Sequence, residues 1–121
     1  MKKYFTIAII FISISLSAQK FSNQFDKKAY ANEQTEMIKS ALDLNQETAD
    51  NVYKLNLSKA YSVQKYIILF ESQDKVKGKT LSQIIKEVNK DAERSVRYQQ
   101  TLKAILGNEK YQQYLEKFGS K

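Results

Sequence analysis

The stretch NQETADNVYKLNLSKAYSVQKYIILFESQ, residues 45–73, decides the fold of this chain. It contains no Gly or Pro, and its mostly apolar positions recur at steps of three and four residues, as one face of an α-helix requires. That face consists of Ala49, Val52, Asn56, Ala60, Val63, Ile67 and Phe70. At roughly 1.5 Å per residue, such a helix extends about 42 Å, longer than a compact bundle of a chain this size is normally wide. We therefore predict an elongated molecule built on one long amphipathic helix.

The C-terminal end of this helix carries an excess of apolar surface. Residues 66–70, YIILF, are five consecutive apolar or aromatic residues, and such a run covers the whole circumference of a helix. One part therefore faces the core, while another part is exposed or contacts a second molecule. Tyrosine suits a contact surface, because its ring covers apolar area while its hydroxyl stays in water. The contact residues that we predict for a client or partner protein are Tyr61, Tyr66, Ile68, Leu69 and Phe70.

The segments on either side of the long helix are predicted to be helical too. A first helix is expected over residues 24–43. Thr80 and Gln83 form a capping box that opens a third helix, antiparallel to the second, and its polar middle, residues 89–100, suggests contact along a narrow seam. A short fourth helix starts at Asn108. The predicted fold class is all-α: an elongated antiparallel helical hairpin with a flanking first helix and a short C-terminal helix, four helices in all.

The first residues, MKKYFTIAIIFISISLSAQ, are typical of a secretory signal peptide. Two lysines form a basic start, residues 4–16 are mostly apolar, and small residues precede a cleavage site near Ala18–Gln19. The alternative is a membrane anchor, but about 13 apolar residues fall short of the roughly 20 that span a bilayer. We therefore predict a cleaved signal peptide over residues 1–19, a periplasmic or secreted protein, and no stable membrane insertion.

Residues 20–121 are predicted to form a single all-helical domain with a positive charge. Without the two lysines of the signal peptide, the 20 basic residues become 18 against 13 acidic ones, a net charge of +5. Basic residues are scattered among acidic ones along every segment, and an exported chain with only two arginines is not expected to bind nucleic acid. The chain has no cysteine, so its stability does not depend on disulfides.

Histidine is absent as well as cysteine. Without these two residue types the chain cannot form the usual zinc sites or a Ser-His or Cys-His nucleophile. Its three glycines are dispersed, so there is no glycine-rich phosphate loop. Carboxylate pairs such as Glu87 and Asp91 are interleaved with lysines and read as ordinary surface pairs. We therefore predict no catalytic residue, no metal site and no cofactor, in a protein that is not an enzyme.

Two short stretches about 60 residues apart resemble each other: LNQET, residues 44–48, and LGNEK, residues 106–110. Each places a leucine just before a turn into a helix, an arrangement that any joint between two helices can also produce. The pair is similar to the L-T-x-x-Q motif that occurs twice in the Spy/CpxP-like family of small bacterial periplasmic proteins. The corresponding motif positions here are Leu44, Asn45, Thr48, Leu106, Asn108 and Lys110.

The match to the motif is partial, whereas its surroundings match better. Asn45 replaces the capping Thr, Gly107 replaces the second Thr, and Thr48 and Lys110 replace the Gln. The stretches QTEMIKSALDL, VYKLNLSKA and EKYQQYLEKF resemble family members in spacing and residue type. The resemblance thus spans most of the chain after the predicted signal peptide.

This resemblance implies an elongated all-α homodimer that holds unfolding clients without ATP, or that represses an envelope-stress sensor. Some family members bind metals through His or Cys, which this chain lacks. The expected function is that of an ATP-independent periplasmic chaperone or stress-response protein with an apolar, lysine-rimmed surface for unfolded clients. The alternative is a dedicated envelope adaptor or sensor-binding subunit. In a third reading, the apolar surface only forms the homodimer.

Overall fold

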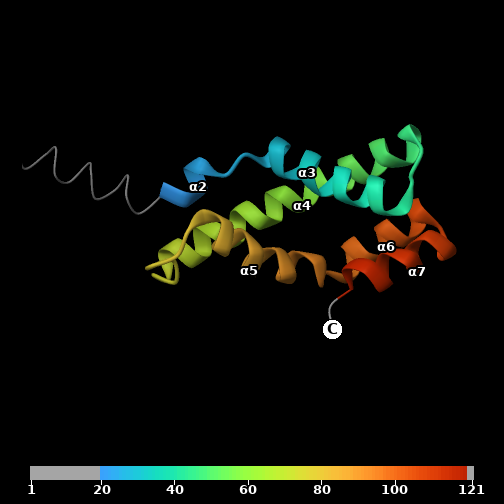
Figure 1. Cartoon of the computed structure of the whole chain (residues 1–121). Coiled ribbons are helices and arrows are strands. Elements are labelled where there is room, and N and C mark those ends of the chain that lie inside the picture. The colour runs from blue at the N-terminus through green and yellow to red at the C-terminus, as the bar shows by residue number, and fades with distance from the viewer. Residues whose placement is uncertain (1–19, 120–121) are drawn as a thin grey trace, which may run out of the picture.

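The computed structural model describes residues 20–119, and the predicted signal peptide over residues 1–19 lies outside the described residues. Within the described part the chain forms six helices and no strand, which confirms the predicted all-α class (Figure 1). The helices are α2 (Lys20–Gln24), α3 (Lys27–Leu42), α4 (Gln46–Ser72), α5 (Leu81–Glu93), α6 (Val96–Leu106) and α7 (Asn108–Phe118). None of them is long and apolar enough to cross a membrane.

The long predicted helix is α4, which is continuous over 27 residues. At 1.5 Å per residue it extends about 40 Å, and the molecule is elongated along it (Figure 1). Asn45 caps its start, as predicted: the side-chain oxygen of Asn45 accepts a hydrogen bond from the Thr48 amide at 2.8 Å. Glu47 lies in the first turn, where a negative charge is favoured by the helix dipole.

The predicted count of four helices is wrong: α2 lies before the first predicted helix except for Gln24, and the third predicted helix is divided into α5 and α6. The helix expected over residues 24–43 is interrupted at Asp26, whose side chain accepts a hydrogen bond from the Ala29 amide at 3.1 Å and so starts α3. The third helix is interrupted at Ser95, which caps α6 by accepting a hydrogen bond from the Tyr98 amide. Asp and Ser favour helix starts, because their side chains replace the missing backbone partner of the first amides.

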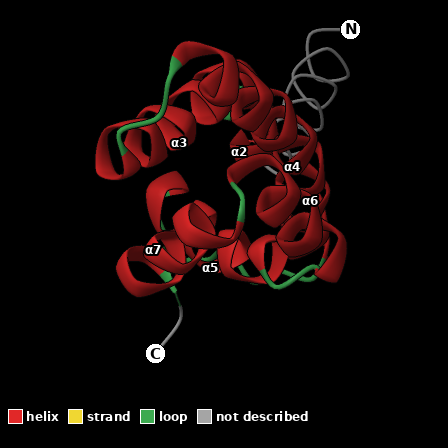
Figure 2. Ribbon diagram, turned by 90° about the vertical axis from the view of Figure 1, so that its right-hand side faces the viewer, coloured by secondary structure: helices red, strands yellow, loops and turns green. Residues whose placement is uncertain are grey.

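The return arm of the predicted hairpin therefore consists of α5 and α6 together. Both run back along α4 (Figure 1). The predicted capping box opens α5, with reciprocal hydrogen bonds between Thr80 and Gln83. Gly107 ends α6 at a φ of +83° and leads directly into α7. Seen nearly end-on in Figure 2, α7 lies below α3 and α6 lies below α4.

The core is divided into two apolar clusters along α4. The first cluster comprises Phe25, Tyr30, Ala60, Val63, Ile67, Ile84, Val88 and Ala92. The second comprises Ile38, Leu42, Leu44, Val52, Tyr98, Leu102, Leu106 and Tyr114. The stretch of α4 between Val52 and Ala60 contributes two polar side chains, Asn56 and Lys59, which are buried between the two clusters.

Candidate functional site

Three of the five predicted contact residues lie on the outer surface of α4. Tyr61, Ile68 and Leu69 are 56%, 51% and 46% exposed, and we call these three residues the α4 strip. Ile68 follows Tyr61 by seven residues, or about two helical turns, so their side chains lie on the same side of the helix. Tyr66 and Phe70, in contrast, pack against the first core cluster. The run over residues 66–70 is thus partly covered and partly exposed.

Lysines border the α4 strip. The Lys27 ammonium lies 5.2 Å from the centre of the Tyr61 ring and donates a hydrogen bond to the Gln64 side chain at 3.1 Å. Lys65 is exposed on α4, one turn from both Tyr61 and Leu69. The strip therefore combines half-exposed apolar surface with two nearby positive charges.

The two motif stretches meet at the opposite end of the molecule. Leu44 and Leu106 are buried in the second core cluster. The Lys110 ammonium donates a hydrogen bond to the Leu42 carbonyl, at the end of α3. Asn108 is the first residue of α7 and makes no side-chain cap, in contrast to Asn45. The motif residues therefore hold a joint between α3, α4, α6 and α7. At 1.5 Å per residue, Asn45 lies about 24 Å along α4 from Tyr61, the nearest residue of the strip.

Lysines also cover the C-terminal end of α3. In addition to Lys110, the Lys117 ammonium donates a hydrogen bond to the Ala41 carbonyl at 2.8 Å. The last carbonyls of a helix have no partner within the helix and carry the negative end of its dipole, so lysines stabilise them. α7 is thereby joined to α3 by polar contacts as well as by the second core cluster.

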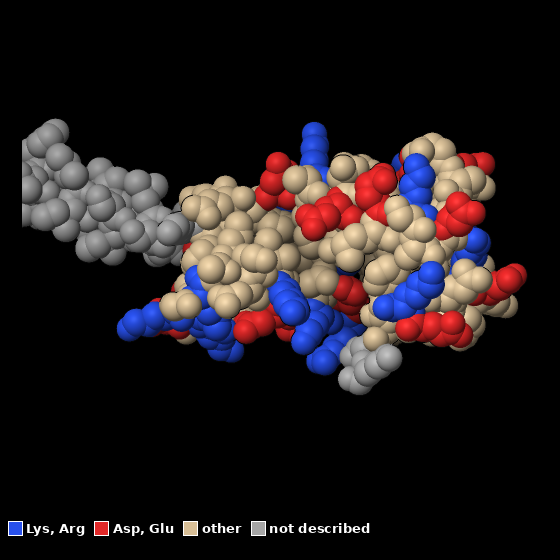
Figure 3. All heavy atoms as spheres, viewed as in Figure 1, with Lys and Arg blue, Asp and Glu red and all other residues tan. Residues whose placement is uncertain are grey.

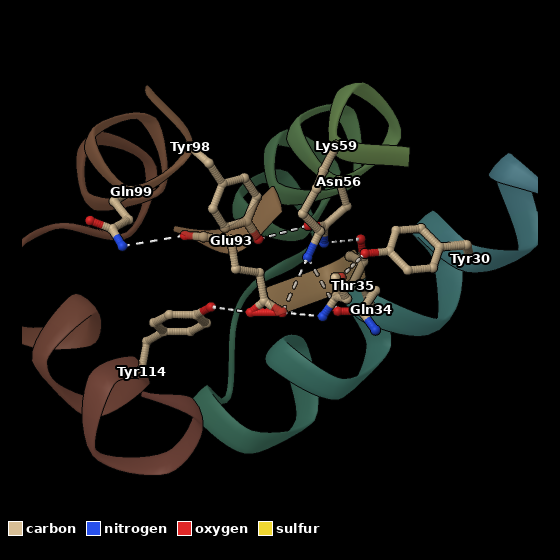
Figure 4. Close-up of polar contacts among 10 residues, drawn as sticks. Tyr30, Gln34, Thr35, Asn56, Lys59, Glu93, Tyr98, Gln99 and Tyr114 are labelled. Atoms are coloured by element: carbon tan, nitrogen blue, oxygen red, sulfur yellow. Dashed lines mark hydrogen bonds and ion pairs between the residues drawn. The ribbon is translucent and has the colours of Figure 1, made fainter. Parts of the chain in front are cut away.

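A polar layer between the two core clusters was not predicted from the sequence (Figure 4). Asn56 is fully buried at its centre; its amide donates to the Thr35 hydroxyl at 3.0 Å, and its carbonyl oxygen accepts from the Tyr98 hydroxyl at 2.9 Å. Thr35 in turn donates to the Ala31 carbonyl at 2.7 Å. Within the described part of the chain, every buried side-chain nitrogen and oxygen has a partner. This layer joins α3, α4 and α6 through side chains alone.

Lys59 is the charged member of the polar layer, with only 5% of its surface exposed. Its ammonium lies 3.8 Å from a carboxylate oxygen of Glu93 and donates to the Gln34 side chain at 3.3 Å. The ring centres of Tyr98 and Tyr30 lie 4.7 and 5.5 Å from the same ammonium, so both rings face the charge. Figure 4 shows these groups converging from α3, α4, α5 and α6.

Glu93 connects this cluster to α7. Its carboxylate accepts hydrogen bonds from the Tyr114 hydroxyl at 3.5 Å and from the Asn89 amide, and Asn89 accepts one from the Tyr30 hydroxyl. A buried ammonium is costly unless it is paired and hydrogen-bonded. Glu93 and its partners meet that requirement for Lys59.

Burial controls the proton affinities in this layer. It lowers the pKa of Lys59 from 10.5 to about 8, although the nearby Glu93 carboxylate acts in the opposite direction. Burial also raises the pKa of Tyr30, Tyr98 and Tyr114 above the ordinary value of 10, and the charge of Glu93 adds to the effect. The tyrosines therefore stay neutral across the physiological range, and Lys59 titrates unusually close to it.

The sequence contains a signal for the polar layer. Lys59 follows Asn56 by three residues and precedes Val63 by four, so it belongs to the inner face of α4 by the same spacing as its apolar neighbours. A lysine at such a position is either exposed at the edge of the face or paired inside it. Its partner Glu93 lies on α5, and the sequence alone does not indicate which acid that is.

Among residues 20–119, no three His, Cys, Asp or Glu side chains are placed to hold a metal ion. Comparisons with protein-family models, curated proteins and solved structures found no match for this chain. The features of this chain that bear on its function are therefore the α4 strip and the motif residues.

Proposed function

We propose that this protein is an exported, non-enzymatic member of the Spy/CpxP-like family, and that it acts as an ATP-independent periplasmic chaperone. In this proposal the α4 strip holds exposed apolar segments of unfolded client proteins. The observation that supports it most is the exposure of Tyr61, Ile68 and Leu69 on a continuous helix whose opposite face is fully packed. Because the helix is supported by both core clusters, the strip is a rigid surface that needs no refolding to receive a client.

The size of the strip favours brief contacts. Complete burial of one large apolar side chain contributes about 1.5–3 kcal/mol, so covering the exposed half of three such residues contributes roughly 3 kcal/mol. That corresponds to about two orders of magnitude in affinity, too little for a permanent complex. A client held this weakly dissociates without ATP, and it can then fold or be captured again.

Charge supplies the second part of the proposed interaction. Lys27 and Lys65 border the strip, and residues 20–121 carry an excess of basic residues. A positive surface accelerates the approach of acidic unfolded chains, and salt screens this attraction. We expect the capture of acidic clients to weaken between 50 mM and 500 mM salt more than the capture of neutral ones.

A homodimer is part of the proposal, since the family resemblance implies one. Two copies would present two strips to one client, which raises the effective affinity without any new contact. Size-exclusion chromatography with light scattering on the purified protein measures both mass and elongation. A monomer at all concentrations would contradict this part of the proposal.

The test of the chaperone function is the aggregation of a chemically denatured model client diluted into buffer with the protein. We expect the parent protein to slow aggregation, and Ile68→Asp/Leu69→Asp to remove most of the effect. The matched control is Met37→Asp/Val96→Asp, which adds the same charge at two exposed apolar residues outside the strip and should act like the parent. Phe70 is left unchanged, because it packs against the core.

Three outcomes would contradict the proposal. Aggregation could be unaffected by folded parent protein, or the strip and control variants could lose activity equally. Alternatively, affinity purification of the protein from envelope extract could recover a single partner protein in stoichiometric amount and no other proteins. That result would identify a dedicated adaptor or sensor-binding subunit instead of a chaperone.

A further inference from the structure

A pocket of about 510 Å³ lies between α5, α6 and α7. Its volume is within the 300–1,000 Å³ range of typical small-molecule sites. Buried Leu102 and Tyr98 of α6 contribute to its lining, while exposed residues of α5 and α7 form its rim. We call it the α5–α7 pocket, and it shares no residue with the α4 strip.

One wall of the pocket is apolar and comes from α7. Tyr111, Tyr114 and Phe118 follow one another at steps of three and four, and all three line the pocket. The Tyr111 and Tyr114 rings are stacked with their centres 6.0 Å apart, and the Phe118 ring lies 5.4 Å from Tyr114. Leu115 adds an exposed leucine to the rim. An apolar chain laid against this wall would contact a continuous row of side chains.

The opposite rim is cationic and comes from α5. Lys86, Lys90 and Arg94 recur every four residues, line the pocket and are exposed. Arg94 approaches Asp91 at 3.9 Å, whereas Lys86 and Lys90 form no ion pair with any residue in the described range 20–119. In Figure 3, basic side chains gather along the lower edge of the molecule in this view, beneath α5.

The pocket lining contains a single carboxylate among the described residues, that of Glu93. It is already occupied by the Lys59 ammonium at 3.8 Å and by the Tyr114 hydroxyl at 3.5 Å. Glu93 is also less exposed than Lys86 and Lys90, so it lies deeper in the pocket. An anionic group is therefore favoured at the lysine rim and disfavoured at the floor.

We infer that the α5–α7 pocket binds a single-chain amphiphile with an anionic head group. The head lies between Lys86 and Lys90, and the apolar chain lies along Tyr111, Leu115 and Phe118. Charge complementarity at one rim and the aromatic row at the other select for this combination over a neutral lipid or a purely ionic ligand. The inference goes beyond the chaperone proposal and does not depend on it, since the two surfaces are separate.

Isothermal titration calorimetry with decanoate, below its micelle concentration, tests the inference on protein purified after expression of the full chain. We expect one saturable site per chain. A parallel titration with decyl phosphate distinguishes a free fatty acid from a phosphate-bearing lipid as the source of the head group, and either ligand supports the site. Uncharged decyl glucoside and cationic decyltrimethylammonium, which carry the same ten-carbon chain, are expected to bind at least tenfold more weakly.

Two pairs of matched variants locate the site. Lys86→Gln/Lys90→Gln should weaken decanoate binding about tenfold, because two charges at a partly desolvated rim are lost. Lys28→Gln/Lys54→Gln removes the same charge from exposed positions elsewhere and should bind like the parent. Leu115→Ser should weaken binding about fivefold through lost apolar contact, whereas Leu69→Ser on the α4 strip should have no effect.

The inference is overturned by any of three results. These results are the absence of saturable decanoate binding to folded protein, binding of the uncharged or cationic amphiphile as tight as that of decanoate, and binding by the pocket variants equal to that of their matched controls. Circular dichroism of each variant confirms that it is folded. None of these results bears on client binding, because the α5–α7 pocket shares no residue with the α4 strip.

Discussion

Replacing Lys59 by methionine should remove a pH dependence from the stability of this protein. The Lys59 ammonium is buried against Gln34 and Glu93, and its pKa falls from 10.5 in the unfolded chain to about 8 in the folded one. Between these two values the unfolded chain binds more protons than the folded protein. The free energy of unfolding therefore rises as the pH rises through this window. At about 1.36 kcal/mol per pKa unit, the whole difference amounts to about 3.4 kcal/mol.

The tyrosines of the polar layer limit this rise. Burial raises the pKa of Tyr30, Tyr98 and Tyr114 above 10, so above pH 10 the unfolded chain loses phenolic protons that the folded protein retains. The free energy of unfolding then falls as the pH rises further. Stability should accordingly reach a maximum near pH 10. At pH 10 Lys59 has contributed roughly 2.5 kcal/mol, and the three tyrosines, half ionised in the unfolded chain, have removed roughly 1 kcal/mol of it.

The measurement is urea unfolding followed by far-UV circular dichroism at pH 7, 8, 9 and 10 and constant ionic strength. The parent should gain roughly 1 kcal/mol between pH 8 and pH 10, the difference between roughly 2 kcal/mol gained from Lys59 and roughly 1 kcal/mol lost from the tyrosines. Lys59→Met should show no rise over this range and should fall by roughly 1 kcal/mol, because the tyrosines remain. It should be less stable than the parent at pH 7, because the partly buried Glu93 carboxylate loses its ammonium partner. Lys54→Met, at an exposed position of the same helix, should keep the rise of the parent. A parent whose stability is constant or falls from pH 8 to pH 10 would refute the reasoning.

Two further substitutions test other parts of the structure. Asn56→Ala should lower the free energy of unfolding by about 2–4 kcal/mol, because the buried Tyr98 hydroxyl loses its acceptor and the Thr35 hydroxyl loses one of its two hydrogen bonds; a loss under 1 kcal/mol in urea unfolding would show that the layer is not tightly packed. Gly107→Ala should lower the free energy of unfolding by about 1–2 kcal/mol. A Cβ at this position has open space around it, so only the φ of +83° opposes the substitution. An unchanged melting temperature would contradict the left-handed turn between α6 and α7.

Local signals were sufficient to predict α4 and the start of α5. Asn45 is a strong helix cap, the following 27 residues contain no helix breaker, and Thr80 with Gln83 forms a complete capping box. These features act within a few residues of sequence. Their physical basis therefore does not depend on the rest of the fold.

The breaks at Asp26 and Ser95 were missed because the apolar pattern continues across them. Ala92 and Tyr98 are both buried on either side of Ser95, and Phe25 is buried immediately before Asp26. An unbroken helix also satisfies such spacing. The chain nevertheless starts a new helix at each position, because the Asp26 and Ser95 side chains accept hydrogen bonds from amides in the first turns of α3 and α6.

The α4 strip and the polar layer both depend on contacts between residues that are distant in the sequence. Helical phase alone accounts for the exposure of Tyr61, Ile68 and Leu69, but it does not account for the cover on Phe70, which comes from residues outside α4. The polar layer joins Lys59 to Glu93, 34 positions apart by their residue numbers. Such pairs are determined by how the helices pack, so a single sequence does not specify them.

The central claim is that unfolded clients contact the α4 strip, and site-specific photo-cross-linking tests it most directly. A photoreactive amino acid is placed at position 68 in the strip, or at position 37, where Met37 is equally apolar and exposed on α3. With a radiolabelled unfolded client, we predict strong cross-links from position 68, weak ones from position 37, and loss of both when the client is folded. Equal cross-linking from the two positions, or none from position 68 while aggregation is still suppressed, would contradict the account.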